Sequence, residues 1–279
     1  TYKLTVGKNK ISVSGITVAD WNTGKITDNG KAEQIIRYVT FTAEAEQKFK
    51  MTTSGNYTIS GLEYSVNNGE WATVQAGTEV PFGGINGTLR LRGTNTYGTA
   101  SASNKYSTIT FTDKTVKVAC TGDIRTLLNW KNYSTVDTQN ARFCYLFNGC
   151  AALTSAPELP ATKLADYCYY SMFEGCKSLT DAPELKATTL ANGCYDNMFN
   201  GCTKLSTVTM LAPSDQISIA SNCCYKWLYN AGTDETVSSR TLKVMDADAY
   251  TALEGKGYLP DNWKKDATNT TVEYYTPKP

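Results

Sequence analysis

The sequence contains no histidine among its 279 residues. Histidine is the side chain used most often for acid–base catalysis near neutral pH and for binding transition metals. Its absence excludes a Ser-His-Asp triad, a Cys-His pair and an imidazole zinc site. An enzyme would have to rely on carboxylates, lysines, tyrosines or a thiol, and the sequence shows no such constellation. We therefore expect a protein that is not an enzyme and that carries no cofactor.

The sequence also lacks an excess of charge and a long apolar run. The 27 basic and 26 acidic side chains leave a net charge of +1, which is no electrostatic footprint for nucleic acid. Mean hydropathy is −0.35, and no segment approaches the ~20 apolar residues of a membrane helix. We expect no nucleic-acid partner and no transmembrane segment, while the oligomeric state is left open. Because the chain starts at Thr1 without a signal peptide, we also expect a leader or an upstream domain to have been removed.

The strongest pattern that is present is an internal repeat with a period of 26 residues. The positions repeated at this period are Phe147, Phe173 and Phe199; Cys150, Cys176 and Cys202; and Leu153, Leu179 and Leu205. A fourth, decayed unit follows if Cys224 and Tyr225 are aligned with Cys194 and Tyr195 after an insertion of four residues. This alignment gives a second cysteine column of Cys168, Cys194 and Cys224. A period of this length is typical of stacked repeats that share one continuous core.

Each unit is predicted to form a short helix, a glycine and a strand. Between Leu164 and Glu174 the apolar residues recur at i, i+4, i+5, i+8 and i+9, which fits one face of a helix. Gly175 then suits a left-handed helix end, and a brief extended segment is predicted from Leu179 to Ala182, ended by Pro183. Strands pack about 4.8 Å apart and helices about 8–10 Å apart. The strand side should therefore be concave.

The nine cysteines are interpreted mainly as buried thiols that act as small apolar side chains. Disulfides remain an alternative, most of all at Cys223 and Cys224. Because the number of cysteines is odd, at least one must be unpaired or bonded to another molecule. A metal site is a third alternative, disfavoured because there is no C-x-x-C pair and no histidine.

The regions around the repeats have other patterns, and they suggest three parts: residues 1–33, 34–118 and 119–279. Residues 34–118 alternate with period two and have frequent turn signals, which predicts a small antiparallel β-sandwich. Its hairpin should turn at Asn68-Gly69 in type I′ geometry. Residues 1–33 should hold one or two strands, at Tyr2–Val6 and Ile11–Val18, and a linker from Asn22 to Lys31.

Exposed repeat ends need caps. We expect residues 122–130 to cap the first unit, with Asp123 as helix N-cap. At the other end we expect a last strand at 241–244, a helix at 246–253 and Trp263 over the last coil.

The repeat FxGCxxLTxAPELxATxLAxxCYxxMF, which runs from Phe147 to Phe199, resembles the BspA-like leucine-rich-repeat family of bacterial surface proteins. The resemblance covers roughly residues 119–265. In the third and fourth units, Thr209 to Leu211 and Ser214 to Ser221 replace the APEL tetrad. In addition, the first 33 residues, and most clearly residues 10–21, are similar to the last strands of fimbrillin-like domains, which build bacterial fimbriae.

These resemblances complete the expected fold and function. The fold class is α+β and multidomain, with an antiparallel β-sandwich followed by a short right-handed leucine-rich-repeat α/β solenoid of three to four units. The implied location is extracellular, at the bacterial outer surface, with an anchor in an upstream segment. The implied role is non-catalytic adhesion to a protein or glycan ligand on host or bacterial surfaces. A structural spacer or tip of a fimbria-like assembly is the alternative.

Candidate binding residues are those that differ between units or lie off the buried stripe. They are Tyr170, Lys163, Lys177, Asp196 and Lys204. Glu158 and Glu184 lie one unit apart, but we interpret them as a like-charged row on a solvated rim and not as a glycosidase pair.

Overall fold

The computed structural model describes residues 36–85 and 87–276, together with the backbone of four strands nearer the N-terminus. The chain divides into two compact units, Thr1–Arg37 and Tyr38–Pro279. In the first unit the two antiparallel pairs are β1 (Leu4–Gly7) with β2 (Lys10–Val13), and β3 (Lys25–Asp28) with β4 (Lys31–Gln34). The prediction of a linker at 22–31 is therefore wrong, because β3 lies within it. The remainder of the predicted strand after Val13, and Trp21, lie outside the described residues.

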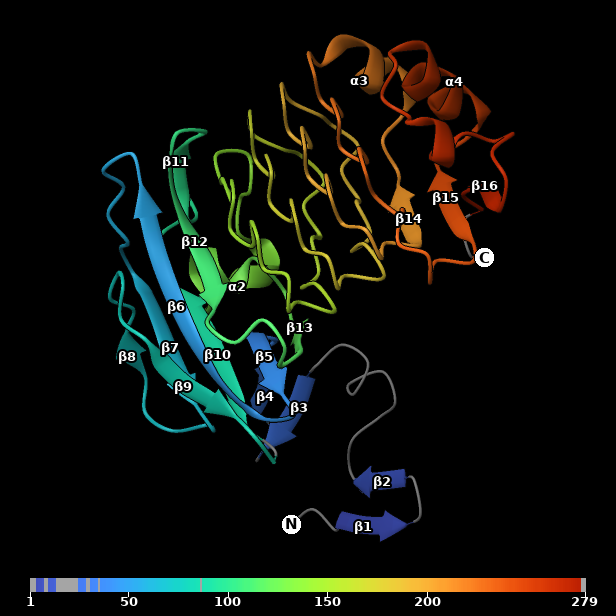
Figure 1. Ribbon diagram of the computed structural model, residues 1–279. Coiled ribbons are helices and arrows are strands. Elements are labelled where there is room, and N and C mark those ends of the chain that lie inside the picture. The colour runs from blue at the N-terminus through green and yellow to red at the C-terminus, as the bar shows by residue number, and fades with distance from the viewer. Residues whose placement is uncertain are drawn as a thin grey trace. The chain divides into compact units, whose positions relative to one another are not determined.

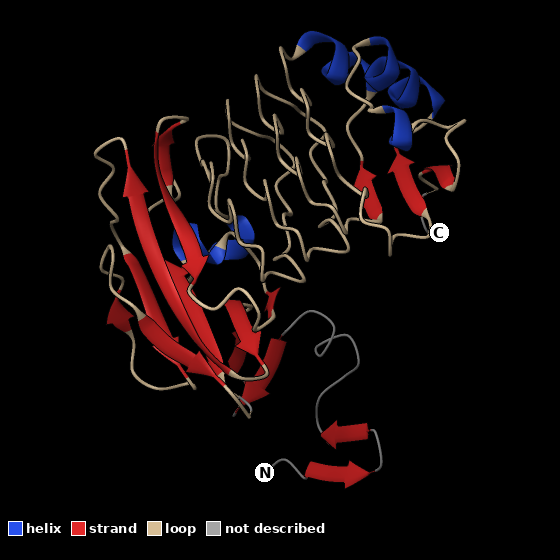
Figure 2. Cartoon of the chain, in the orientation of Figure 1, coloured by secondary structure: helices blue, strands red, loops and turns tan. Residues whose placement is uncertain are grey.

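The second unit begins with two antiparallel sheets (Figures 1 and 2). The five-stranded sheet, in spatial order, consists of β13 (Val118–Thr121), β5 (Val39–Ala43), β10 (Thr88–Gly93), β7 (Leu62–Val66) and β8 (Ala72–Thr73). The four-stranded sheet consists of β11 (Ala100–Ala102), β12 (Lys105–Phe111), β6 (Glu46–Ser54) and β9 (Val80–Gly83). The described chain is mostly antiparallel sheet with few helices, so of the expected α+β class only the β-rich part is confirmed.

Alternating side chains from both sheets form a shared core. In β5, Val39, Phe41 and Ala43 are buried and the residues between them are not, which is the period of a half-buried strand. The ring centroid of Phe41 lies 6.2 Å from that of Phe49 in β6 and 5.3 Å from that of Phe111 in β12. Residues from the two sheets therefore pack against each other as the sequence pattern predicted.

The β7–β8 hairpin turns one residue earlier than predicted. Asn67 and Asn68 have φ values of 52° and 61°, and Gly69 donates its amide to the Val66 carbonyl at 2.8 Å. The two left-handed positions of the type I′ turn are thus filled by Asn-Asn and not by Asn68-Gly69. Asparagine tolerates this backbone region far better than most side chains, which makes the shift possible.

The predicted helix at 164–174 is wrong. The structure has three α-helices among its described residues, α2 (Thr126–Asn129), α3 (Ser214–Ile219) and α4 (Ala247–Gly255), and none lies in this segment. Instead, residues 166–175 form consecutive turns in which Tyr167, Ser171 and Gly175 have φ values of 58°, 49° and 73°. One left-handed residue in every four gives the segment a period of four, which buries the same i, i+4, i+5, i+8 and i+9 positions as a helix does.

The amides of these turns bind the neighbouring repeat. Within residues 167–175, every second amide donates to a carbonyl 25 residues further on, as Tyr169 does to Cys194 and Phe173 does to Met198, both at 2.9 Å. The amides between them close the turns, as Met172 does on the Tyr169 carbonyl at 3.1 Å. We call each turn segment with its extended return a coil. The turn segments of coils 1 to 4 span residues 141–149, 167–175, 193–201 and 222–230.

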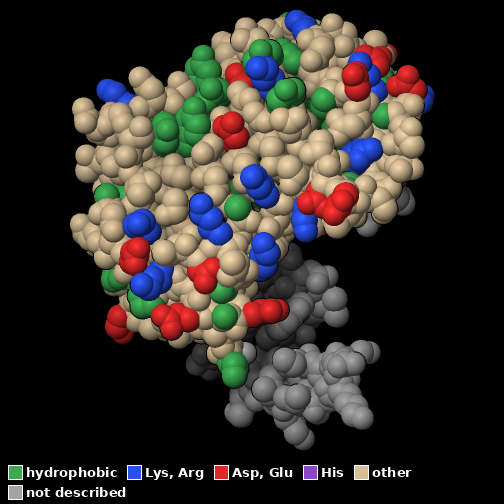
Figure 3. All heavy atoms as spheres, viewed as in Figure 1, with side chains coloured by type: hydrophobic (Ala, Val, Ile, Leu, Met, Phe, Trp, Pro, Cys, Tyr) green, Lys and Arg blue, Asp and Glu red, His purple; other side chains and the backbone are tan. Residues whose placement is uncertain are grey.

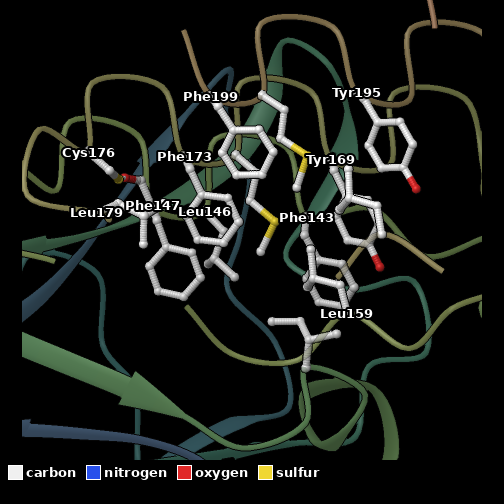
Figure 4. Packing of buried hydrophobic residues seen from close by; sticks show 14 of the residues in the cluster. Phe143, Leu146, Phe147, Leu159, Tyr169, Phe173, Cys176, Leu179, Tyr195 and Phe199 are labelled. Atoms are coloured by element: carbon white, nitrogen blue, oxygen red, sulfur yellow. The ribbon is translucent and has the colours of Figure 1, made fainter. Parts of the chain in front are cut away.

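The interior of the coils consists of columns of like side chains (Figure 4). The rings of Phe147, Phe173 and Phe199 stack nearly parallel, with centroids 5.2 and 5.7 Å apart. A second row runs through Phe143, Tyr169 and Tyr195, with spacings of 6.1 and 6.0 Å. The Phe, Cys and Leu columns of the 26-residue repeat are all buried. Two of the column thiols donate to a phenylalanine carbonyl one coil earlier, Cys176 to Phe147 at 3.1 Å and Cys202 to Phe173 at 3.0 Å.

The fourth coil is offset by three inserted residues and not by four. Left-handed residues at 222, 226 and 230 match those at 193, 197 and 201, and the Tyr195 amide donates to the Cys223 carbonyl at 2.8 Å. Cys223 therefore continues the Cys168–Cys194 column. The predicted place of Cys224 in that column is wrong, because Cys224 takes the position of Tyr195.

The extended returns of the coils run parallel on the side away from the turns. Isolated parallel bridges join Asp181 to Thr207 and Leu185 to Met210. Regular pairing then begins with β14 (Thr207–Met210), β15 (Arg240–Val244) and β16 (Thr270–Tyr274). Residues 241–244 are therefore not the last strand, because β16 follows them in parallel.

The two antiparallel sheets cap the first coil. The Val118 amide in β13 donates to the Ala152 carbonyl at 3.0 Å, and the Ile109 amide in β12 donates to the Leu146 carbonyl at 2.7 Å. The Phe41 ring also meets Phe147, with centroids 6.2 Å apart. Both sheets therefore cap the first coil together with residues 122–130. The prediction that Asp123 is the helix N-cap is wrong, because the N-cap residue of α2 is Arg125.

The C-terminal end is closed by helices and two tryptophans. Asp246 is the N-cap of α4 and accepts a hydrogen bond from the Ala249 amide at 2.8 Å. Trp263, in the 3₁₀ turn η2 (Asp261–Trp263), is fully buried and donates to the Ala231 carbonyl at the end of the coil 4 turns at 3.0 Å. Trp227 of coil 4 donates to the Tyr258 carbonyl at 3.1 Å.

Candidate functional site

The turn segments leave one set of side chains pointing outward, and we call this surface the turn face. Its two central rows follow directly from the period of four and the coil register. One row is Tyr170, Asp196 and Tyr225, and the other is Asn148, Glu174, Asn200 and Tyr229. All seven side chains are half-buried or exposed, whereas the residue that precedes each of them in sequence is buried.

A chain of side-chain hydrogen bonds crosses the middle of the turn face. Glu174 accepts from Asn148 at 3.1 Å and from Asn200 at 3.4 Å, one on each carboxylate oxygen. Asn200 also donates to the Asn197 side-chain oxygen at 3.0 Å, and Asn197 donates to Asp196 Oδ1 at 2.7 Å. The chain spans coils 1 to 3 and holds these amide and carboxylate groups in fixed positions.

Three oxygens of this chain have spare accepting capacity. Asp196 Oδ2, Asn148 Oδ1 and Asn200 Oδ1 accept no hydrogen bond from the residues that the structure describes. Partial burial, followed by the nearby Glu174 carboxylate, raises the pKa of Asp196 to about 6, while Lys226 and Asn197 oppose the rise. The middle of the turn face is therefore rich in acceptors and carries little free positive charge.

Coil 4 adds two exposed aromatic rings. The side chains of Tyr225 and Tyr229 are 44% and 50% exposed. The Lys226 ammonium group lies 5.2 Å from the Tyr225 ring centroid and 5.8 Å from that of Tyr229. Lys226 has a φ of 50°, in the row of left-handed residues. Both distances are typical of cation–π contacts. Lys226 therefore helps to hold the two tyrosine rings in fixed positions before any ligand binds.

A second group of tyrosines lies over coils 1 and 2. The Tyr145 ring stacks on Tyr106 of β12 at 4.1 Å and meets the edge of Tyr170 at 5.2 Å. Tyr170 meets Tyr167 at 5.8 Å, and the Tyr167 ring covers Gly193, where an added Cβ would lie 2.7 Å from the ring. Figure 3 shows hydrophobic-type side chains gathered over the coils beside β11 and β12. These rings mostly contact one another, which leaves less free surface than the coil 4 pair.

The structure brings together two of the five candidate residues. Tyr170 and Asp196 occupy the same row on adjacent coils, and the Ser171 amide next to Tyr170 donates to the Asp196 carbonyl at 2.9 Å. Lys163 forms an isolated parallel bridge with Thr189. Its side chain is exposed and lies away from that row. Lys177 and Lys204 are exposed at the corners that follow Gly175 and Gly201.

Sequence reasoning missed most of the turn face. The Asn148, Glu174 and Asn200 row was visible at the 26-residue period, but it was not singled out. Lys226 and Tyr229 were hidden by the four-residue alignment of coil 4, which placed Tyr229 in the buried phenylalanine column. The three-residue offset instead moves that tyrosine to the surface.

Glu158 and Glu184 line a different hollow. With Pro157, Pro160 and Pro183 they border a shallow cavity of about 200 Å³ on the extended returns of coils 1 and 2. Glu184 pairs with Lys186 at 3.2 Å.

A stack of alternating cations and rings covers the outer side of the five-stranded sheet. The Arg92 guanidinium lies 4.1 Å from the Trp71 ring centroid and 4.4 Å from that of Trp130, while it pairs with Glu63 at 2.7 Å. Arg90 lies 5.4 Å from Tyr38 and 5.2 Å from Trp71. Since Trp130 follows helix α2, the stack fastens the start of the repeat region to the sheet.

All nine cysteines are free thiols and buried. Burial raises the pKa of Cys144 and of Cys150 to about 12, which suppresses the reactive thiolate. A hydrogen bond from Cys224 lowers the pKa of Cys223, but Cys223 has no exposed surface. Among the described residues, no group of three or more Cys, Asp or Glu side chains could hold a metal ion.

The comparisons with known proteins add nothing to this picture: no protein-family model, no curated protein and no solved structure matches the chain. Within the described residues, no helix has the length and apolar character needed to cross a lipid bilayer.

Proposed function

We propose that this chain is a non-catalytic binding protein of a bacterial outer surface. In this proposal the coils form a short leucine-rich-repeat solenoid, a β-sandwich carries it, and the turn face meets the ligand. The ligand would be a protein or a glycan on host or bacterial surfaces. The family resemblance of the repeat motif is the reason for placing the protein outside the cell.

One observation carries the proposal: inward positions stay buried and largely apolar from coil to coil while outward positions change in polarity and charge. Phenylalanine fills one buried column in coils 1 to 3, whereas the neighbouring outward row reads Asn148, Glu174, Asn200 and Tyr229. A rigid frame with variable outward side chains suits recognition, because little conformational freedom is lost when a partner binds.

The test is a binding assay with the whole chain on three surfaces: immobilised matrix proteins, cultured host cells and bacterial cells. We expect saturable binding to at least one surface, and the heat-denatured chain serves as the control. If no surface binds the chain and it instead polymerises with rising concentration, the structural-spacer role replaces the binding role. β16, which ends the parallel sheet, would then be the first strand to examine.

A further inference from the structure

The turn face combines exposed rings with unused hydrogen-bond acceptors. Tyr225 and Tyr229 present their rings on coil 4, and Asp196 and Asn200 lie on coil 3 next to them. The Asn197 amide donates to the Tyr225 carbonyl at 2.9 Å, so the two coils are directly bonded at this point. Rings and acceptors therefore belong to one rigid patch.

The chemistry of the patch fits a polyhydroxylated ligand. A sugar ring has one face of C–H groups, which packs on an aromatic ring, and a rim of hydroxyls, which donate hydrogen bonds. Tyrosine supplies a large contact area at low entropic cost, and carboxylate and amide oxygens accept from hydroxyls. The free Oδ2 of Asp196 and Oδ1 of Asn200 are acceptors of this kind.

The charge of the patch argues against an anionic ligand. Asp196 and Glu174 are carboxylates, and the cation beside Asp196, Lys226, already contacts both tyrosine rings. A sulfated or carboxylated ligand would meet carboxylates without a free cation among the described residues of the patch. A neutral ligand is not repelled by these carboxylates. It can also form hydrogen bonds with the uncharged side chains of the three asparagines in the hydrogen-bonded chain.

The coil spacing also fits a chain of sugars. The centroids of stacked interior rings on adjacent coils lie 5.2 to 6.1 Å apart, which is close to the length of one pyranose residue in an oligosaccharide. Successive sugar units could therefore meet equivalent outward positions on successive coils.

We propose that the turn face binds a neutral glycan, with sugar rings against Tyr225 and Tyr229 and hydroxyls donating to Asp196 and Asn200. The inference rests on the proposed binding function and goes further, because it names the ligand class and the patch. The Tyr106–Tyr145–Tyr170 group lies at the other end of the same face and could extend the contact of a long chain.

The experiment is affinity electrophoresis of the whole chain through gels that contain mannan, xyloglucan, mixed-linkage β-glucan or desialylated mucin. We expect retardation in at least one gel. Tyr225→Ala and Tyr229→Ala should each weaken the apparent affinity about tenfold, and the double variant should migrate as it does in a plain gel. Asn200→Ala, which leaves both rings in place, should weaken the affinity about three- to tenfold, the range expected for one hydrogen bond.

The control variant is Tyr274→Ala, an exposed tyrosine of β16 that should leave retardation unchanged. Urea unfolding of each variant separates lost binding from lost folding. The inference is overturned if no gel retards the chain, or if the double variant is retarded like the wild type. It is also overturned if an oligo-arginine peptide, and no polysaccharide, binds in a way that needs the two rings. Binding to matrix or cells without retardation in any gel would overturn the glycan inference alone, and absence of both would overturn the proposed function as well.

Discussion

Replacing Phe173 with alanine removes the central ring of the aromatic stack. The side chain is fully buried, and its ring contacts those of Phe147 and Phe199 at 5.2 and 5.7 Å with interplanar angles of 2° and 5°. A buried Phe→Ala substitution costs about 3–5 kcal/mol, and each aromatic contact contributes about 0.5–1.5 kcal/mol beyond its buried area. Because Phe173 has a stacked partner on both sides, we expect a loss near the upper end, about 4–5 kcal/mol.

Urea unfolding followed by circular dichroism measures this loss as a shift in midpoint at constant slope. Phe173→Leu retains most of the volume and should cost about 1.5 kcal/mol. Tyr229→Ala removes an exposed ring and should change the free energy of unfolding by no more than about 0.5 kcal/mol. A loss below about 1 kcal/mol for Phe173→Ala would refute the claim that the coils share one packed interior.

Two further predictions concern the turns and the polar row. Gly193 has a φ of 59° and lies beneath the Tyr167 ring, so Gly193→Ala should cost about 1–3 kcal/mol. Gly77 has a φ of 79° and open space around it, so Gly77→Ala adds only backbone strain and should lower the free energy of unfolding by less. If urea unfolding shows equal losses for the two variants, the placement of Tyr167 over Gly193 is contradicted. Asp196 has its pKa raised from 3.8 to about 6, so the folded state holds this proton more tightly than the unfolded chain. The free energy of unfolding should therefore fall as pH rises through this window, and Asp196→Asn should remove that part of the slope; identical pH profiles would exclude the raised pKa.

The sequence was informative wherever a pattern had one structural meaning. Alternation with period two located β5 and β10, since only a half-buried strand places every second side chain in a core. The 26-residue spacing of Phe147, Phe173 and Phe199 likewise identified side chains that the structure stacks on one another.

The sequence misled where two structures share one pattern. Apolar residues at i, i+4, i+5, i+8 and i+9 fit a helix of 3.6 residues per turn and also a series of four-residue turns. The deciding feature is the left-handed backbone at Tyr167 and Ser171, and neither residue type signals such a conformation. The conformational propensities of these residue types do not predict the left-handed backbone, because hydrogen bonds to the next coil stabilise it.

The candidate site was only partly predictable for a related reason. Two adjacent cysteines, Cys223 and Cys224, permit either a three- or a four-residue insertion, and the choice decides whether Tyr225 and Tyr229 are buried or exposed. Tyr170 could be predicted because it lies off the buried stripe, and Asp196 because it differs between aligned repeats. The exposure of Tyr229 and Lys226 can be predicted only when the alignment of coil 4 with coil 3 is known. The hydrogen bonds between these coils and the buried Trp227 establish that alignment.

The most direct test of the stacked interior is a thiol count by mass spectrometry after alkylation of native and denatured protein. The structure buries all nine cysteines as free thiols, Cys120 in β13 and the others in the coils, so the native chain should gain no adduct in a short reaction. After denaturation without reductant, the same chain should gain nine adducts. Rapid alkylation of several thiols in the native protein, or a denatured chain that takes up fewer than nine because disulfides are present, would contradict the account.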